Sequence, residues 1–337
     1  MWTTRRDRGG PGTVTPVESD LLGPPYQRHV IELADDAEGP VTATLVRRLA
    51  GPAGPGRAAV LYVHGFIDYF FQTHLADFYV ERGIDFYAID LRKYGRSLAD
   101  HQTPNHCAAI ADYYPELDEA ARLIRSVDGH DRLLVNGHST GGLIAALWAN
   151  DRRADGVVDG LFLNSPFLDL PGPWLMRRPG VALVSGLARY APELRLPFAV
   201  SEVCGRSIHH DLHGTWPYDL TWKPLTGFPV RTSWLRAIRQ GQLRVRSGLD
   251  LTIPVLVAAS TASYTGRWSP AAQRSDTVLD VAAIARWSAT LGRCVTLIRV
   301  DGGLHDLTLS PPPVRDRLFA DVGHWLTGYF DPATSRR

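Results

Sequence analysis

One serine stands in a pattern that could make it a nucleophile. The segment Gly137-His138-Ser139-Thr140-Gly141 fits G-x-S-x-G, and it lies between an apolar run and a helix-compatible apolar pattern. A serine at the tip of a sharp strand-to-helix turn has a strained backbone, so the residues two before and two after it must be small. The pattern therefore predicts Ser139 as a nucleophile, although an ordinary strand-to-helix loop could carry the same letters.

A serine hydroxyl needs a base within hydrogen-bond reach, and a third group must orient that base. Of the twelve histidines, only His64, His138 and His305 directly follow a predicted strand, where the functional loops of an open α/β sheet lie. His138 adjoins Ser139 and is expected to point another way. His305 follows the last strand on a glycine-containing loop and keeps the chain order serine, acid, histidine, so we predict it as the base.

Three aspartates compete for the role of the orienting acid. Asp276 and Asp280 both follow the strand that ends at Ala259, and Asp169 follows the strand before it. Asp276 lies in a polar loop ahead of an apolar helical stretch, whereas Asp280 is one turn inside that stretch. Asp276 could instead be only a helix N-cap. We predict Asp276 as the acid, with Asp280 and Asp169 as alternatives.

Backbone amides are the expected donors to an oxyanion. One is the N–H of Thr140, which directly follows the serine, and the other comes from the loop after the third strand. The segment His64-Gly65-Phe66 supplies that loop, so the N–H of Phe66 is the predicted second donor. Gly65 would let the backbone approach closely, and His64 is expected to hold the loop in place.

Short buried runs alternate with helical patterns along most of the chain, which predicts a mostly parallel sheet with helices on both faces. The predicted strands lie at residues 29–33, 41–46, 58–63, 84–89, 133–135, 160–166, 253–260 and 295–300. The alternation stops at about Leu168 and resumes after Leu249, so we expect an insertion at one end of the sheet. The expected units are a disordered tail (1–19), a core in two parts (20–167 and 251–337) and an inserted cap (168–250).

Two groups of side chains in the insertion could have a function. Four tryptophans could wall an apolar pocket over Ser139, or could equally form the cap's own core, namely Trp174, Trp216, Trp222 and Trp234. His209 and His213 would share a face of a helix, as zinc ligands do, but Gly214 and Pro217 follow at once. We therefore expect no metal and no cofactor.

Composition limits the classes of partner. The chain has 337 residues, 45% apolar and 21% charged, with a net charge of +1, which gives no reason to expect nucleic acid or an anionic membrane. Three scattered cysteines indicate free thiols in a reducing compartment. With no secretory pattern and no run long enough to span a bilayer, we expect a cytoplasmic protein without membrane insertion.

Together these motifs resemble the α/β-hydrolase fold, in the branch of monoacylglycerol lipases and serine aminopeptidase-like (S33) hydrolases. The matching segments are 64–66, 90–92 with 95–97, 137–142, 276–280 and 302–306. The resemblance implies an eight-stranded sheet with a cap inserted after the sixth strand. It also implies a serine hydrolase that cleaves the carboxylic ester of a small-molecule acyl substrate. A thioester, amide or lactone, or a non-catalytic ligand receptor, would be the alternatives.

Overall fold

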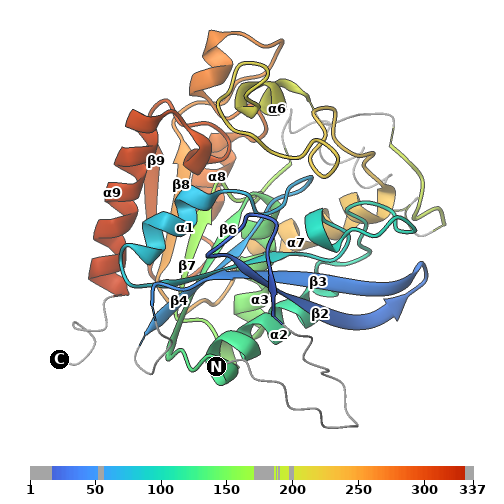
Figure 1. The fold of residues 1–337 in the computed structure, drawn as a ribbon. Coiled ribbons are helices and arrows are strands. Elements are labelled where there is room, and N and C mark those ends of the chain that lie inside the picture. The colour runs from blue at the N-terminus through green and yellow to red at the C-terminus, as the bar shows by residue number, and fades with distance from the viewer. Residues whose placement is uncertain are drawn as a thin grey trace.

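A nine-stranded sheet with the order β1-β2-β3-β5-β4-β6-β7-β8-β9 forms the centre of this computed structural model (Figure 1). The structure describes residues 17–51, 57–170, 186, 188, 190–196 and 201–330. The strands are β1 (Glu18–Ser19), β2 (Gln27–Asp36), β3 (Gly39–Arg48), β4 (Ala58–Val63), β5 (Asp85–Asp90), β6 (Arg132–His138), β7 (Gly160–Asn164), β8 (Val255–Ser260) and β9 (Val295–Val300).

The middle of the sheet is parallel and buried on both faces. Strands β5, β4, β6, β7, β8 and β9 pair in parallel, whereas β1, β2, β3 and β5 pair antiparallel at the other edge. Every residue of β4, β5, β7 and β8 is buried. Strands covered on both faces need no polar side, which explains their continuous apolar runs.

Helices cover both faces of the sheet. They are α1 (Thr73–Val80), α2 (Tyr114–Arg122), α3 (Thr140–Asp151), α6 (Val203–Ile208), α7 (Thr232–Arg246), α8 (Val281–Ser288) and α9 (Pro312–Tyr329). Short 3-10 helices lie at Gly95–Ser97, Ile110–Tyr113, Arg153–Asp155, Pro270–Arg274 and Leu307–Leu309, and a π-helical turn lies at Leu123–Val127. Helices α1 and α9 pack into one apolar cluster, and α2, α3, α7 and α8 pack into the other. None of the described helices is long and apolar enough to cross a membrane.

The prediction of a mostly parallel sheet with helices on both faces is confirmed. The eight predicted strands correspond to β2–β9, and the structure adds β1 at the edge, where Glu18 and Ser19 pair with Arg28 and Gln27. The expected tail, residues 1–19, includes these two residues. A two-residue polar edge strand has no periodicity to reveal it, and an ion pair between Glu18 and Arg28 accompanies the pairing. The rest of the expected tail, residues 1–16, lies outside the described part.

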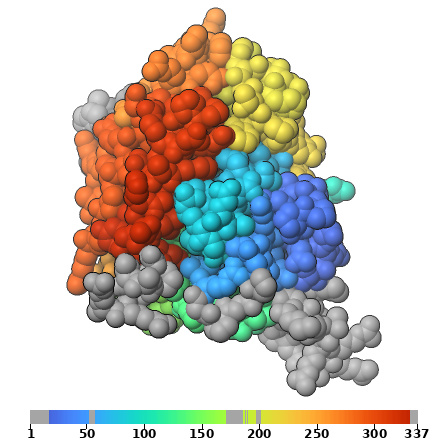
Figure 2. Space-filling model, turned by 60° about the vertical axis from the view of Figure 1, so that its left-hand side comes forward, coloured from blue at the N-terminus to red at the C-terminus, as the bar shows by residue number. Residues whose placement is uncertain are grey.

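The chain between β7 and β8 interrupts the strand–helix alternation. Within it, α7 packs on α3 closely enough that a Cβ atom on Gly241 would lie 2.9 Å from Leu147 Cδ1. Helix α6 lies beyond the end of the sheet, beside the 3-10 helix Pro270–Arg274 (Figure 1). In Figure 2 the yellow atoms of the segment around residues 201–230 lie against the light-blue atoms that follow β4. This segment therefore stands over the carboxyl ends of the central strands.

A buried ion-pair cluster fixes the loop after β5, where the segments 90–92 and 95–97 lie. Arg96 is 1% exposed and binds Asp20 and Asp90, whose side chains are fully buried. Asp90 also accepts the N–H of Phe70, in the loop after β4. The backbone at Gly95 has φ +45°, and a Cβ atom there would overlap Tyr69. This cluster joins the β4 and β5 loops beside the end of the sheet.

Arg96→Met is expected to destabilise the fold by about 3–5 kcal/mol, because it leaves two buried carboxylates without their cation. Urea unfolding at neutral pH measures the loss. Arg122→Met is the matched control, because Arg122 forms an exposed ion pair with Glu119, and it should cost about 1 kcal/mol or less. Equal stability of the two variants would contradict the structural role of Arg96.

Candidate active site

Ser139 lies at a sharp reversal between β6 and α3. Its backbone has φ +51° and ψ −116°, a region that a residue with a side chain rarely adopts. A Cβ atom on Gly137 would lie 2.7 Å from the oxygen of Gly141, and one on Gly141 would overlap the carbonyl oxygens of Val63 and His64. The two glycines of the motif therefore allow the reversal.

A continuous hydrogen-bonded chain runs from this serine to a buried carboxylate. His305 Nε2 lies 3.0 Å from Ser139 Oγ, and His305 Nδ1 lies 2.9 Å from Asp276 Oδ2. The other oxygen of Asp276 accepts the N–H groups of Val278 and Leu279, both at 2.8 Å. All three side chains are buried. Since Asp276 can only accept, His305 donates from Nδ1 and presents Nε2 as an acceptor for the serine proton.

The two alternative acids have other partners. Asp280 is the N-cap of α8 and accepts the N–H groups of Ala282 and Ala283. Asp169 forms ion pairs with Arg239 and Arg246. The structure thus brings Asp276, and neither Asp280 nor Asp169, to the imidazole. Asp276 also accepts the N–H groups of Val278 and Leu279, but it is not the N-cap of α8, because that position belongs to Asp280.

The loop after β4 lies against the serine. A Cβ atom on Gly65 would lie 3.1 Å from Ser139 Cβ, so only a glycine fits there without a shift. His64 holds the loop, because its Nδ1 lies 2.8 Å from the oxygen of Gly65 and its Nε2 accepts the N–H of Leu91 at 3.0 Å. Burial lowers the pKa of His64, which favours the neutral ring that this pattern requires.

A cavity of about 700 Å³ opens over the serine. Ser139, His305, Phe66 and Thr140 all line it, and most of the remaining wall is apolar. Thr140 is the first residue of α3, so its N–H has no acceptor within the helix. Ser139, His305 and the two residues predicted to donate to an oxyanion therefore line one cavity of a size that suits a small organic ligand.

A family model supplies the identification that this geometry leaves open. Residues 54–311 match the model described as serine aminopeptidase, S33. The chain belongs to the serine aminopeptidase S33 family. It is therefore a hydrolase with the α/β-hydrolase fold, as the resemblance implied. No curated protein matches the chain significantly.

Several solved structures are similar in fold to this S33-family chain. A monoacylglycerol lipase from Paleococcus ferrophilus has a TM-score of 0.62 at 19% identity, covering 82% of this chain and 96% of the lipase. A soluble variant of monoglyceride lipase from Saccharomyces cerevisiae, in complex with a substrate analogue, has a TM-score of 0.62 at 17% identity, covering 89% and 94%. Est1E from Butyrivibrio proteoclasticus, with bound ferulic acid, has a TM-score of 0.57 at 14% identity, covering 89% and 98%.

The four cap tryptophans of this S33 chain do not act alike. Trp234 lines the cavity and packs on Phe66, with ring centroids 4.0 Å apart. The expectation is wrong for Trp216 and Trp222, which are not among the lining residues. Trp216 donates its indole N–H to the oxygen of Leu309, and Trp222 packs edge-on against Tyr69. Trp216 and Trp222 therefore pack the cap against the core. Trp174 lies outside the described residues.

His138 also faces the cavity, which corrects our expectation that it points another way. Its ring centroid lies 4.9 Å from that of His305, and its Nδ1 lies 3.2 Å from the oxygen of Asn164. The positive φ of Ser139 breaks the alternation of side chains that β6 would otherwise continue. Burial lowers the pKa of His138.

Asp306 belongs to the site, although we did not single it out in the sequence. It directly follows His305, lines the cavity and accepts hydrogen bonds from Asn164 and from both the N–H and the hydroxyl of Thr308. Burial alone would raise the pKa of Asp306, but the positive charge that His138 carries when protonated and the hydrogen bonds of Thr308 and Asn164 lower it to about 2. The carboxylate thereby anchors the histidine loop to the end of β7.

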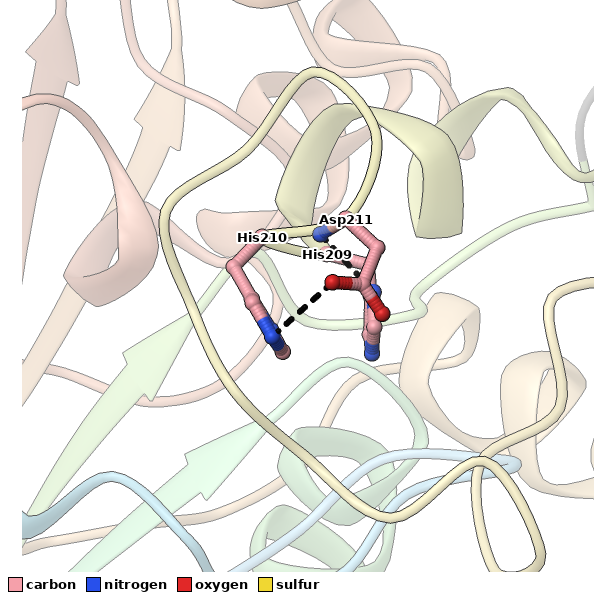
Figure 3. A group of neighbouring side chains, drawn as sticks. All are labelled: His209, His210 and Asp211. Atoms are coloured by element: carbon pink, nitrogen blue, oxygen red, sulfur yellow. Dashed lines mark hydrogen bonds and ion pairs between the residues drawn. The ribbon is translucent and has the colours of Figure 1, made fainter.

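Three side chains of the cap come close enough to suggest a metal site, as Figure 3 shows for His209, His210 and Asp211. Helix α6 ends at Ile208, so His209 and His213 do not share a helical face, and His213 stacks on Trp268 instead. The rings of His209 and His210 lie 4.7 Å apart and 32° from parallel. His209 Nδ1 and His210 Nε2 lie 3.7 Å and 3.1 Å from the Asp211 carboxylate, so the three side chains are partners of one another.

Asp306→Asn is expected to destabilise the fold by less at acid pH than at neutral pH. A carboxylate with a depressed pKa stabilises the native state above its unfolded pKa, and the contribution is lost as pH falls toward the folded value of about 2. The difference in unfolding free energy between wild type and variant should shrink by about 1 kcal/mol from pH 6 to pH 3. Urea unfolding at both pH values measures it, and a constant difference would contradict the assigned role.

Proposed function

We propose that this S33-family chain hydrolyses a carboxylic ester through Ser139, His305 and Asp276. The observation that carries the proposal is the hydrogen-bonded chain from the buried Asp276 through His305 to Ser139 Oγ, whose serine end lines a largely apolar cavity. A serine with a base at 3.0 Å, and a base with a buried carboxylate at 2.9 Å, is the arrangement that activates a hydroxyl at neutral pH.

The proposed reaction has two half-reactions. His305 Nε2 takes the proton from Ser139 Oγ as that oxygen attacks the ester carbonyl carbon, and Asp276 stabilises the imidazolium that forms. The N–H groups of Phe66 and Thr140 bind the oxyanion of the tetrahedral intermediate. His305 then gives the proton to the departing alkoxide, leaving an acyl-serine. Water, activated by His305, attacks this acyl group and releases the acid.

The substrate is proposed to carry an apolar group beside the ester carbonyl. Trp234 and Phe66 form a pair of tilted aromatic rings that lines the cavity with the serine, and Leu235 and Leu279 also line it. Solved lipases and esterases of this fold include one bound to a substrate analogue and one bound to ferulic acid. Thioesters, amides and lactones could use the same residues, so hydrolysis rates across a panel of matched acyl donors decide among them.

A reducing, cytoplasmic setting is part of the proposal. All three cysteines, Cys107, Cys204 and Cys294, are free thiols in the structure. Burial raises the pKa of Cys107 and that of Cys204 to about 12, so their thiolates are scarce at neutral pH. Fractionation of the source cells with an antibody to the chain tests the compartment.

Ser139→Ala is expected to lower kcat/KM for p-nitrophenyl butyrate by at least about 10³-fold, because no other group replaces the attacking oxygen. Ser247→Ala is the matched control, since Ser247 Oγ donates only to the oxygen of Arg244 at the end of α7. The control should keep the wild-type rate. A Ser139→Ala variant with an unchanged rate would rule out the proposed nucleophile.

Asp276→Asn is expected to lower kcat by about 10³–10⁴-fold, because the amide no longer selects the imidazole tautomer that accepts the serine proton. Asp280→Asn is the matched control in the same loop region, because Asp280 caps α8, whereas Asp276 is the carboxylate bonded to His305. It should change kcat by less than about 3-fold and leave stability nearly unchanged, because asparagine caps a helix about as well as aspartate does. A large loss of kcat in Asp280→Asn, together with a small loss in Asp276→Asn, would instead identify Asp280 as the orienting acid.

A further inference from the structure

A segment of the cap docks on the loop that follows the predicted oxyanion residue. The N–H of Asp219 donates to Tyr69 Oη at 2.7 Å, and Trp222 packs edge-on against the same ring at 5.2 Å. Tyr218 packs on Phe71, with ring centroids 5.3 Å apart. Residues 216–223 are thereby fixed over residues 68–71, two segments far apart in the sequence.

An ion pair at the end of this segment reaches the cavity. Lys223 Nζ lies 2.5 Å from Asp68 Oδ1, and the two side chains are 14% and 2% exposed. Both residues line the cavity that contains Ser139. The rings of Phe71 and Tyr218 lie 5.4 Å and 5.6 Å from the ammonium group, so aromatic faces shield it from water. Such a desolvated pair has a fixed geometry, unlike an exposed one.

The same carboxylate contacts the loop against the serine. Asp68 Oδ2 accepts the N–H of Gly65 in a long hydrogen bond of 3.5 Å. Between them, Ile67 has φ +53°, a left-handed conformation that is costly for a β-branched residue and persists only when its surroundings hold it. One carboxylate therefore connects a cap lysine to the backbone on either side of Phe66.

We propose that Lys223 is a positioning residue that orients the N–H of Phe66 toward the substrate oxyanion through Asp68. This inference rests on the proposed ester hydrolysis. With Lys223 in place, Asp68 keeps one orientation and holds Gly65 against Ser139. Without it, the carboxylate turns toward other donors, and the turn at Ile67 relaxes. The docked cap segment and the conformation of the loop after β4 are thus linked through one ion pair.

Kinetics of Lys223→Met test the coupling. Oxyanion donors act mainly in the transition state, so kcat for p-nitrophenyl butyrate should fall about 10-fold while KM changes by less than about 3-fold. Lys223→Arg keeps the charge and should recover most of kcat. Arg206→Met is the matched control, because it removes a cation of the same cap that pairs with Glu202 outside the cavity, and it should leave kcat unchanged. A change confined to KM, or no change, would overturn the proposal.

The double variant Lys223→Met/Asp68→Asn separates positioning from a simple loss of folding, because it leaves no unpaired buried charge. Its kcat should be no lower than that of the worse single variant, since both act through the same loop. Additive losses would show that the two residues act independently and would overturn the coupling.

Hydrogen–deuterium exchange tests the same link without turnover. Exchange in residues 64–72 should be faster in Lys223→Met than in wild type, while exchange in α9 stays the same. If the wild type hydrolyses no acyl donor, the proposed function fails, yet this measurement still decides whether Lys223 holds the loop. Unchanged exchange in residues 64–72 would overturn the inference.

Discussion

The reversal of the chain at Ser139 is the constraint on which the site depends. It holds the serine in a left-handed conformation, and it is possible only because Gly141 lies directly against the carbonyl oxygens at the end of β4. That contact also sets the distance between the serine and the loop after β4. The buried parallel strands on either side stabilise the strained backbone, because they cannot shift without breaking the hydrogen bonds between strands. The rigid carboxyl end of the sheet thus presents the Ser139 side chain to the cavity.

Buried carboxylates fix the remaining parts of the site. Asp276 uses one oxygen for backbone amides and the other for His305, and Asp306 ties the same loop to Asn164 at the end of β7. Asp68 connects the loop after β4 to Lys223 in the cap. Each carboxylate joins segments that are distant in the sequence, so the geometry of the cavity follows from charge pairing as much as from apolar packing.

The sequence was sufficient to predict the fold and to predict which side chains meet at the carboxyl ends of the strands. Ser139 and His305 could be identified because parallel strands place their carboxyl ends at one edge, and Asp276 because few carboxylates follow the right strand. Trp216 and Trp222 could not be assigned, since an insertion without periodicity does not reveal which side its aromatic rings face. The pairing of Lys223 with Asp68 joins residues 155 positions apart, and no local pattern indicates it.

The most direct test of the account is a crystal structure of the protein after reaction with a fluorophosphonate. We expect one adduct, on Ser139 Oγ, with a phosphonyl oxygen about 2.7–3.1 Å from the backbone nitrogens of Phe66 and Thr140. His305 should then lie within hydrogen-bond distance of the serine oxygen. An adduct on another residue, or a phosphonyl oxygen turned away from both amides, would contradict the account.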